Sequence, residues 1–172
     1  MSRLETGMLK LKIDWCDINE LIYKVIRQNK EISSSHAIIF EPNNTFPLCK
    51  LDAGLLEQII HNIIHNALTY TPENSIIKIE ANFQNDICKI VISDNGNGFP
   101  EEEIEFVFDK FYRLKNSSAG GTGLGLSIVK GYLKAMNGNI TLYNLPQNGG
   151  AKFSIEIPCE LSNMNLNYSS YA

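Results

Sequence analysis

The chain has 172 residues, 44% of them hydrophobic and 20% charged, which fits one compact globular domain with short extensions. Its net charge of -4 and its scattered Lys and Arg residues argue against a nucleic-acid-binding protein, which needs a clustered basic face. The apolar runs are too short to span a bilayer, and the N-terminus lacks the apolar core of a secretory signal, so we expect a cytoplasmic domain. The cysteines are far apart with no C-x-x-C pair, and we expect reduced core thiols at Cys16, Cys49, Cys88 and Cys159.

The first predicted elements are one helix and two short strands. Apolar residues at helical spacing predict an amphipathic helix over residues 17–30, with Asp14 or Asp17 as its cap. Short apolar runs at residues 37–40 and 48–51 flank a turn-rich segment that contains Pro and two Asn. We expect these two runs to pair with each other as strands.

The middle of the chain carries the strongest helix and a hairpin. The helix is predicted over residues 52–70, and the turn signals around Pro72 end it. Two strands follow at residues 75–84 and 87–94, and Asn85-Asp86 joins them as a tight turn.

After a glycine-rich turn, Pro100 and three acidic residues predict the first turn of a short helix. The remaining expected elements are a mobile loop over residues 115–121, a helix over 124–136, and a strand pair over 140–145 and 151–157. This order of helices and paired strands indicates an α+β fold, a two-layer sandwich in which helices cover one face of a mixed sheet.

Three polar residues form a line along the strongest helix. At about 100° per residue, Asn62, Asn66 and Tyr70 follow one another every fourth residue along the edge of the apolar face. A buried carboxamide must find partners, so each Asn either ties down a loop or binds a hard cation such as Mg²⁺ through its oxygen. Two Asn in line with a Tyr that can stack on a base favour the cation site.

The same helix carries two histidines at a spacing that zinc sites also use. His61 and His65 lack a third zinc ligand and the Glu of H-E-x-x-H, so we expect them on a solvated face.

Two glycine clusters flank the later part of the domain. The first places Asp94 at a strand end in a D-x-G-x-G turn with Gly96 and Gly98. A carboxylate only accepts hydrogen bonds, so Asp94 can take the exocyclic amine of adenine and reject guanine; an ordinary Asx-type turn is the alternative. The second cluster leads into a helix, whose free N–H groups suit phosphate oxygens. Its members are Gly120, Gly121, Thr122, Gly123, Leu124, Gly125 and Leu126.

Between the clusters lies the aromatic and basic segment of residues 108–113. Phe108 and Phe111 are expected to anchor a short helix, while Lys110 and Arg113 can reach phosphates. A plain hydrophobic contact with solvated cations explains the segment equally well when it is taken alone.

Together and in this order, the motifs resemble the catalytic ATP-binding domain of sensor histidine kinases over about residues 17–158. Residues 62–72 look like the N box, 94–98 the G1 box, 108–113 the F box and 121–126 the G2 box. The resemblance implies the Bergerat-type ATP-binding fold, with ATP and Mg²⁺ as cofactors.

The resemblance also implies roles for single residues. Asn66 is the expected Mg²⁺ ligand, with Asn62 near the phosphates, Tyr70 against adenine and Asp94 on its amine. Residues 115–121 are the expected ATP lid. Arg113 joins Asn62 and Asn66 as a catalytic residue, and the other expected nucleotide contacts are Gly96, Gly98, Lys110 and residues 121–126.

Asn62 separates this chain from other branches of the superfamily. Clamp ATPases and serine kinases tend to have Glu four residues before the Mg²⁺ ligand, because water or a hydroxyl must lose a proton to attack. A neutral imidazole already carries a lone pair, so Asn62 favours a histidine acceptor. Thr69 departs from the family pattern, which often has Lys or Arg there.

The chain lacks the histidine acceptor motif of the family, since its three histidines precede Ala37, Asn62 and Asn66 rather than an acidic residue. We expect the acceptor in a helical dimerisation domain outside this chain, and the fragment to bind ATP without labelling itself. The parent is expected to be anchored in the inner membrane and to pass the phosphoryl group to a response regulator.

The expected domain division is the end of a dimerisation helix over residues 1–12, the catalytic domain over 13–160 and a frayed tail over 161–172. The alternative is a degenerate nucleotide-sensing or scaffolding module without phosphotransfer.

Overall fold

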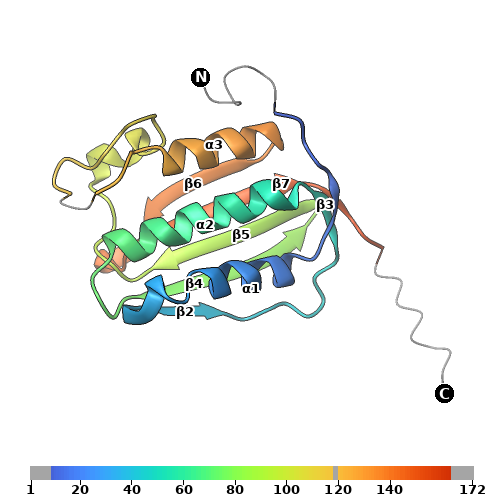
Figure 1. Ribbon diagram of the computed structural model, residues 1–172, viewed down its shortest axis with the longest axis horizontal. Coiled ribbons are helices and arrows are strands. Elements are labelled where there is room, and N and C mark those ends of the chain that lie inside the picture. The colour runs from blue at the N-terminus through green and yellow to red at the C-terminus, as the bar shows by residue number, and fades with distance from the viewer. Residues whose placement is uncertain (1–8, 118–119, 164–172) are drawn as a thin grey trace.

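The computed structural model describes residues 9–117 and 120–163, which fold into two layers (Figure 1). Five strands form a mixed sheet in the order β2-β4-β5-β7-β6, in which β2 runs parallel to β4 and the other neighbours are antiparallel. Figure 1 shows α1, α2 and α3 side by side over one face of this sheet. The predicted α+β sandwich is therefore confirmed. The elements are β1 (Asp14–Cys16), α1 (Ile18–Gln28), β2 (Ala37–Phe40), β3 (Cys49–Leu51), α2 (Ala53–Tyr70), β4 (Ile76–Gln84), β5 (Ile87–Asp94), α3 (Gly125–Ala135), β6 (Asn139–Asn144), β7 (Ala151–Pro158) and β8 (Glu160–Leu161).

The first two helices begin where Asp residues cap them. The Asp17 side chain accepts a hydrogen bond from the Glu20 backbone N–H at 3.0 Å, which satisfies one free donor of α1. Asp52 caps α2 in the same way and also accepts from the Lys12 backbone N–H at 2.8 Å. The carboxylate of Asp52 thus ties the incoming chain to the start of the helix that carries the polar line.

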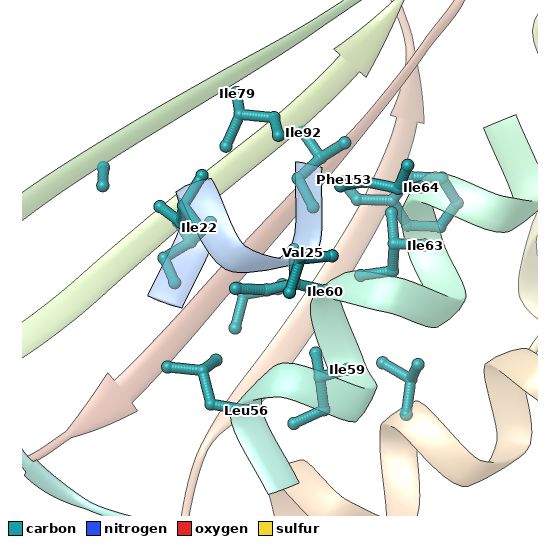
Figure 2. Close-up of a cluster of buried hydrophobic side chains, with 14 of the residues drawn as sticks. Ile22, Val25, Leu56, Ile59, Ile60, Ile63, Ile64, Ile79, Ile92 and Phe153 are labelled. Carbon is teal, nitrogen blue, oxygen red and sulfur yellow. The ribbon is translucent and has the colours of Figure 1, made fainter. Parts of the chain in front are cut away.

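The core lies between the helices and the sheet (Figure 2). Branched aliphatic side chains of α1 and α2 point toward those of the strands, and all of the labelled side chains are buried. The labelled residues are Ile22, Val25, Leu56, Ile59, Ile60, Ile63, Ile64, Ile79, Ile92 and Phe153. Because both layers bury one face here, α2 is held in a fixed rotation and its polar edge is fixed with it.

The predicted pairing of residues 37–40 with 48–51 is wrong. Ala37–Phe40 forms β2, which pairs in parallel with β4 at the edge of the main sheet. Cys49–Leu51 forms β3, the middle strand of a separate three-stranded sheet in the order β1-β3-β8. Each run pairs with a strand far along the chain rather than across the nearest turn.

The hairpin prediction is confirmed. β4 and β5 pair in antiparallel register from Ile77 opposite Asp94 to Gln84 opposite Ile87. Asn85 and Asp86 have φ of 51° and 58°, the left-handed conformation that a two-residue type I′ turn requires and that Asn and Asp tolerate.

Part of the predicted domain division lies outside the described residues. This holds for residues 1–8 of the expected dimerisation helix and for residues 164–172 of the expected tail. Among the residues that the structure describes, no helix combines the length and the apolar character that a membrane span needs.

Candidate functional site

A cleft runs along the polar edge of α2. It consists of two adjoining cavities of ≈ 260 Å³ and ≈ 380 Å³. Residues that line both are Asn66, Thr69, Tyr70, Phe99 and Leu114. The first cavity also contains the predicted residues Asn62, Arg113, Gly121, Thr122, Gly123, Gly125 and Leu126, and the second contains Asp94 and Gly98. Most of the predicted site residues therefore converge on one cleft.

Three predicted site residues do not line it: Gly96, Lys110 and Leu124. Gly96 and Leu124 instead support its walls. The Gly96 backbone N–H donates to Asp94, and Leu124 occupies the cap position of α3. Lys110 lies outside both cavities, and its predicted contact with the nucleotide stays a prediction.

The polar line has the expected geometry. Asn62 reaches the first cavity, while Asn66 and Tyr70 lie where the two cavities meet. The hydroxyl of Thr69 donates to the backbone carbonyl of His65 at 2.8 Å, so it is turned onto the helix. His65, expected on a solvated face, is exposed but also lines the first cavity.

Asp94 closes the second cavity at the end of β5. Its Oδ1 accepts hydrogen bonds from the backbone N–H groups of Gly96 at 2.9 Å and Ala151 at 3.3 Å. Both of these bonds end on one oxygen, which fixes the carboxylate of a residue that lines the second cavity. Burial raises the pKa of this carboxyl, and the two backbone hydrogen bonds offset part of the effect.

Asn144 is a site residue that sequence reasoning missed. Its Oδ1 accepts from the Phe99 backbone N–H at 2.8 Å, and its Nδ2 donates to the Phe99 carbonyl at 2.7 Å and to Glu101 Oε1 at 2.8 Å. Gly98 has a φ of 71°, and a Cβ there would lie 2.5 Å from Asn144 Oδ1. The last residue of β6 thus clamps the turn that follows Asp94.

We expect Asn144→Ala to lower the free energy of unfolding by about 1–3 kcal/mol, because partly buried backbone groups of Phe99 lose their partners. Thermal unfolding followed by circular dichroism measures this change, and nucleotide affinity should fall because the turn loosens. The matched control is Asn139→Ala, an exposed position on the same strand, which should stay within about 0.5 kcal/mol of the parent chain. Equal stability of the two variants would contradict the clamp.

The start of α3 leaves room for an anion. Leu124 caps the helix with no side-chain hydrogen bond, so the first backbone N–H groups are not satisfied by a capping side chain. A Cβ added at Gly120 or Gly125 would meet nothing within 4 Å, which indicates open space beside this helix end. Such an end suits phosphate oxygens.

The segment 108–113 differs from its prediction. Phe111 does not anchor a helix: it is 70% exposed and has a φ of 63°, and its backbone N–H donates to the Gly123 carbonyl at 3.0 Å. The short helix lies earlier, as the 3-10 helix Glu101–Phe106. Phe108 does pack against the core. The spacing of the two Phe residues matched a helix, but the backbone at Phe111 is left-handed and is hydrogen-bonded to Gly123, so it is not helical there.

Glu103, a second missed residue, stands under this segment. It is buried and accepts hydrogen bonds from the Tyr112 hydroxyl at 2.6 Å and the Lys115 backbone N–H at 3.2 Å. The hydrogen bond to Glu103 raises the pKa of Tyr112 to about 12. Glu103 therefore holds both ends of the stretch that carries Arg113 to the first cavity.

The donor set fits Mg²⁺ bound together with phosphates. Within residues 9–117 and 120–163, no three His, Cys, Asp or Glu side chains group closely enough to hold a metal by themselves. A carboxamide oxygen at Asn66 offers one hard ligand, and Mg²⁺ commonly takes its remaining ligands from phosphates and water.

Known proteins share this fold and sequence. Residues 51–161 match the family described as histidine kinase-, DNA gyrase B-, and HSP90-like ATPase. The sensor protein KdpD of Escherichia coli (strain K12) is 31% identical over 92% of this chain and 18% of its own length, and the sensor protein EvgS of the same organism is 32% identical over 94% and 14%. The catalytic domain of histidine kinase ThkA superposes with a TM-score of 0.77 at 29% identity, over 86% of this chain and 96% of that domain.

The fold and the cleft define an ATP-binding domain. The chain belongs to the family of histidine kinase-, DNA gyrase B- and HSP90-like ATPases, and within it the chain is a catalytic ATP-binding domain of the sensor histidine kinase type. It spans only 11% and 18% of the length of the first two curated relatives.

Proposed function

We propose that this chain binds Mg-ATP in the cleft and, within a longer sensor kinase, donates the γ-phosphoryl group to a histidine outside this chain. One observation carries the proposal: Asn62, Asn66 and Tyr70 line the same cavity as Arg113 and the glycine segment before α3. ATP has a base, a chain of anionic oxygens and a bound cation, and this cavity system offers a counterpart to each.

The base and the phosphates take opposite ends of the cleft in this proposal. Adenine lies in the second cavity, with its amine on Asp94 Oδ2 and its ring against Tyr70. The phosphates extend into the first cavity toward the N-terminus of α3 and Arg113. Asn66 lines both cavities, which supports its assignment as the Mg²⁺ ligand between the two ends.

Phosphoryl transfer then depends on position and charge. When bound, Mg²⁺ neutralises part of the negative charge that develops on the transferring group. Arg113 and the backbone N–H groups of α3 hold the phosphate oxygens, and Asn62 orients them without acting as a base. A neutral imidazole needs no base, so Asn62 supports a histidine acceptor over water or a hydroxyl group.

The partners follow from this chemistry. We infer that the acceptor histidine lies in a helical dimerisation domain of the parent protein and that a response regulator receives the phosphoryl group from it. A solved structure of histidine kinase ThkA in complex with response regulator protein TrrA, 24% identical to this chain, is in line with this inference. Attachment of the parent to the inner membrane stays an expectation.

Asn66→Ala tests the metal ligand. We expect roughly 10–100-fold weaker Mg²⁺-dependent ATP affinity, because one oxygen ligand is lost. Isothermal titration calorimetry with ATP, with and without Mg²⁺, measures the difference. Asn82→Ala makes the same chemical change at an exposed position of β4 that lines neither cavity, and it should bind like the parent chain. Unchanged Mg²⁺-dependent affinity of the Asn66 variant would exclude this ligand.

Phosphotransfer needs a separate experiment. The purified chain is mixed with the histidine-containing helical domain of its parent and with γ-³²P-labelled ATP. We expect label on the helical domain and none on this chain. Label on this chain would contradict an external acceptor. ATP binding without any labelled product would favour the alternative, a nucleotide-sensing or scaffolding module.

A further inference from the structure

A series of side-chain hydrogen bonds connects the start of β2 with the end of α2. His36 lies between the 3-10 helix Ile32–Ser35 and β2. Its Nδ1 is 2.9 Å from Ser35 Oγ, and its Nε2 is 2.9 Å from Thr71 Oγ1. The Thr71 hydroxyl in turn donates to the Ala67 backbone carbonyl at 2.7 Å. These groups are partly buried, so the contacts hold the imidazole between two secondary structure elements.

The backbone fixes His36 from both sides. The Asn74 N–H donates to the Ser35 carbonyl at 2.6 Å, and the Ala37 N–H donates to the Ser75 carbonyl at 3.1 Å. Both partners belong to the loop between α2 and β4, which therefore lies against the start of β2. The contact of the imidazole with this loop is thus supported by the main chain and does not depend on one side-chain rotamer alone.

Only one arrangement of protons turns all three side-chain contacts into hydrogen bonds. A backbone carbonyl carries no proton, so the single proton of the Thr71 hydroxyl goes to Ala67. The Thr71 oxygen then accepts from the Nε2–H of His36, and the unprotonated Nδ1 accepts from the Ser35 hydroxyl. His36 is therefore neutral in this arrangement, with its proton on Nε2.

Thr71 connects this series to the cleft. It lines the second cavity, as Asp94 does, whereas His36 lines neither cavity. A Cβ added at Gly96 would lie 2.6 Å from Thr71 Cγ2, so the turn after β5 packs directly on the Thr71 side chain. The Gly96 N–H is one of the two donors that hold Asp94 Oδ1. A shift of Thr71 would therefore reach the Asp94 carboxylate through one glycine.

We propose that His36 is a positioning residue for the adenine base of ATP. It does not touch the nucleotide. Its Nε2–H holds the Thr71 side chain in place, and Thr71 keeps the Gly96 turn and Asp94 in the geometry that receives the adenine amine. This role rests on the proposed function, because it concerns the end of the cleft in which adenine is placed.

His36→Ala tests the role with two ligands, ATP and inorganic tripolyphosphate, which has no base. We expect roughly 3–10-fold weaker ATP affinity, because one hydrogen bond that orders the adenine end is lost. Tripolyphosphate affinity should stay within about twofold of the parent chain, because the first cavity keeps its residues. Isothermal titration calorimetry, by direct titration and by competition, measures both.

His61→Ala is the matched control, since His61 is half-buried like His36 and lines neither cavity. It should bind both ligands like the parent chain. Unchanged ATP affinity of the His36 variant, or an equal loss for ATP and tripolyphosphate, would overturn the positioning role. A parent chain that does not bind ATP at all would instead overturn the proposed function itself.

His36→Gln tests whether the donor is what matters. The Gln side chain presents an N–H donor that can reach the Thr71 oxygen, and it should restore ATP affinity to within about twofold of the parent. Thr71→Val removes the hydroxyl and keeps the branched shape beside Gly96, so it should bind ATP like His36→Ala. The double variant should be no weaker than the weaker single variant, because both changes break one contact. Failure of His36→Gln to restore affinity, or losses that add in the double variant, would contradict the role.

The position of the proton can be observed in the parent chain. ¹⁵N NMR distinguishes the two neutral imidazole tautomers, and we expect the proton of His36 on Nε2. The chain has three histidines, so His61→Ala and His65→Ala identify the other two sets of signals. A proton on Nδ1 would overturn the proposal even if His36→Ala fails to fold, because Nε2 could then not donate to Thr71.

Discussion

Asp94→Asn should weaken ATP binding by roughly 30–1000-fold, the equivalent of about 2–4 kcal/mol, while the fold keeps its stability. Two backbone donors, on Gly96 and Ala151, hold Oδ1 of Asp94. An Asn placed on these donors through its oxygen turns its NH₂ group toward the ligand. Two donors, this NH₂ group and the adenine amine, then face each other in place of the charge-assisted hydrogen bond that we propose for the parent chain.

The same substitution should change which base is preferred. Inosine triphosphate carries a carbonyl where adenine has its amine, so it can accept from the new NH₂ group. Calorimetric titration of ATP and inosine triphosphate against parent and variant measures the ratio of affinities. Asp86→Asn is the matched control, since Asp86 is an exposed residue in the β4–β5 turn and Asn tolerates its φ of 58°. A variant that keeps its preference for ATP would contradict the adenine contact.

The pH dependence of this site has a definite sign. Burial raises the pKa of Asp94 in the folded chain above its ordinary value of 3.8. The stability that Asp94 contributes is therefore fully present below the ordinary pKa and is lost as the pH rises through the raised pKa. Near neutral pH the buried charge costs stability, and Asp94→Asn should give a Tm equal to or above that of the parent. Adenosine binding should fall on acidification in the parent chain and less so in the variant.

The polar line on α2 was predictable because it depends on one local period. A helix fixes the direction of each side chain at 3.6 residues per turn, so the positions of Asn62, Asn66 and Tyr70 follow once the apolar face is buried. The cleft confirms that the three lie together. The turn with Asn85-Asp86 was predictable for the same kind of reason, since its conformation is set within four residues.

The clamps around the site were not predictable, because they join distant strands. Asn144 is 45 residues from Phe99, and Ala151 is 57 residues from Asp94. These contacts depend on the strand order β5-β7-β6, which a pattern of apolar residues does not determine. β1 and β8 were missed because they have three and two residues, too few to display an alternation.

Gly150→Ala should lower the free energy of unfolding by at least about 3 kcal/mol and Tm by at least about 6 °C. Gly150 has a φ of 97°, which an L side chain rarely adopts, and a Cβ there would lie 1.9 Å from the Asp94 carbonyl oxygen. Its backbone carbonyl also accepts from the Leu145 N–H at 2.8 Å. The overlap is with backbone, so relief requires that β5 and the start of β7 move apart.

This separation should also weaken ATP binding, because the Ala151 N–H that holds Asp94 Oδ1 moves with the strand. Gly54→Ala makes the same change in the first turn of α2, where a Cβ would meet an ordinary contact of 3.4 Å with Asp52. It should leave ATP binding intact and raise stability slightly, by about 0.5 kcal/mol, because Ala favours the helix. Thermal unfolding and calorimetry on both variants provide the comparison. A Gly150 variant as stable as the Gly54 variant would contradict this prediction. It would mean that β5 and β7 can separate at Asp94 without a loss of stability. The close approach of these strands would then not determine the shape of the proposed adenine end of the cleft.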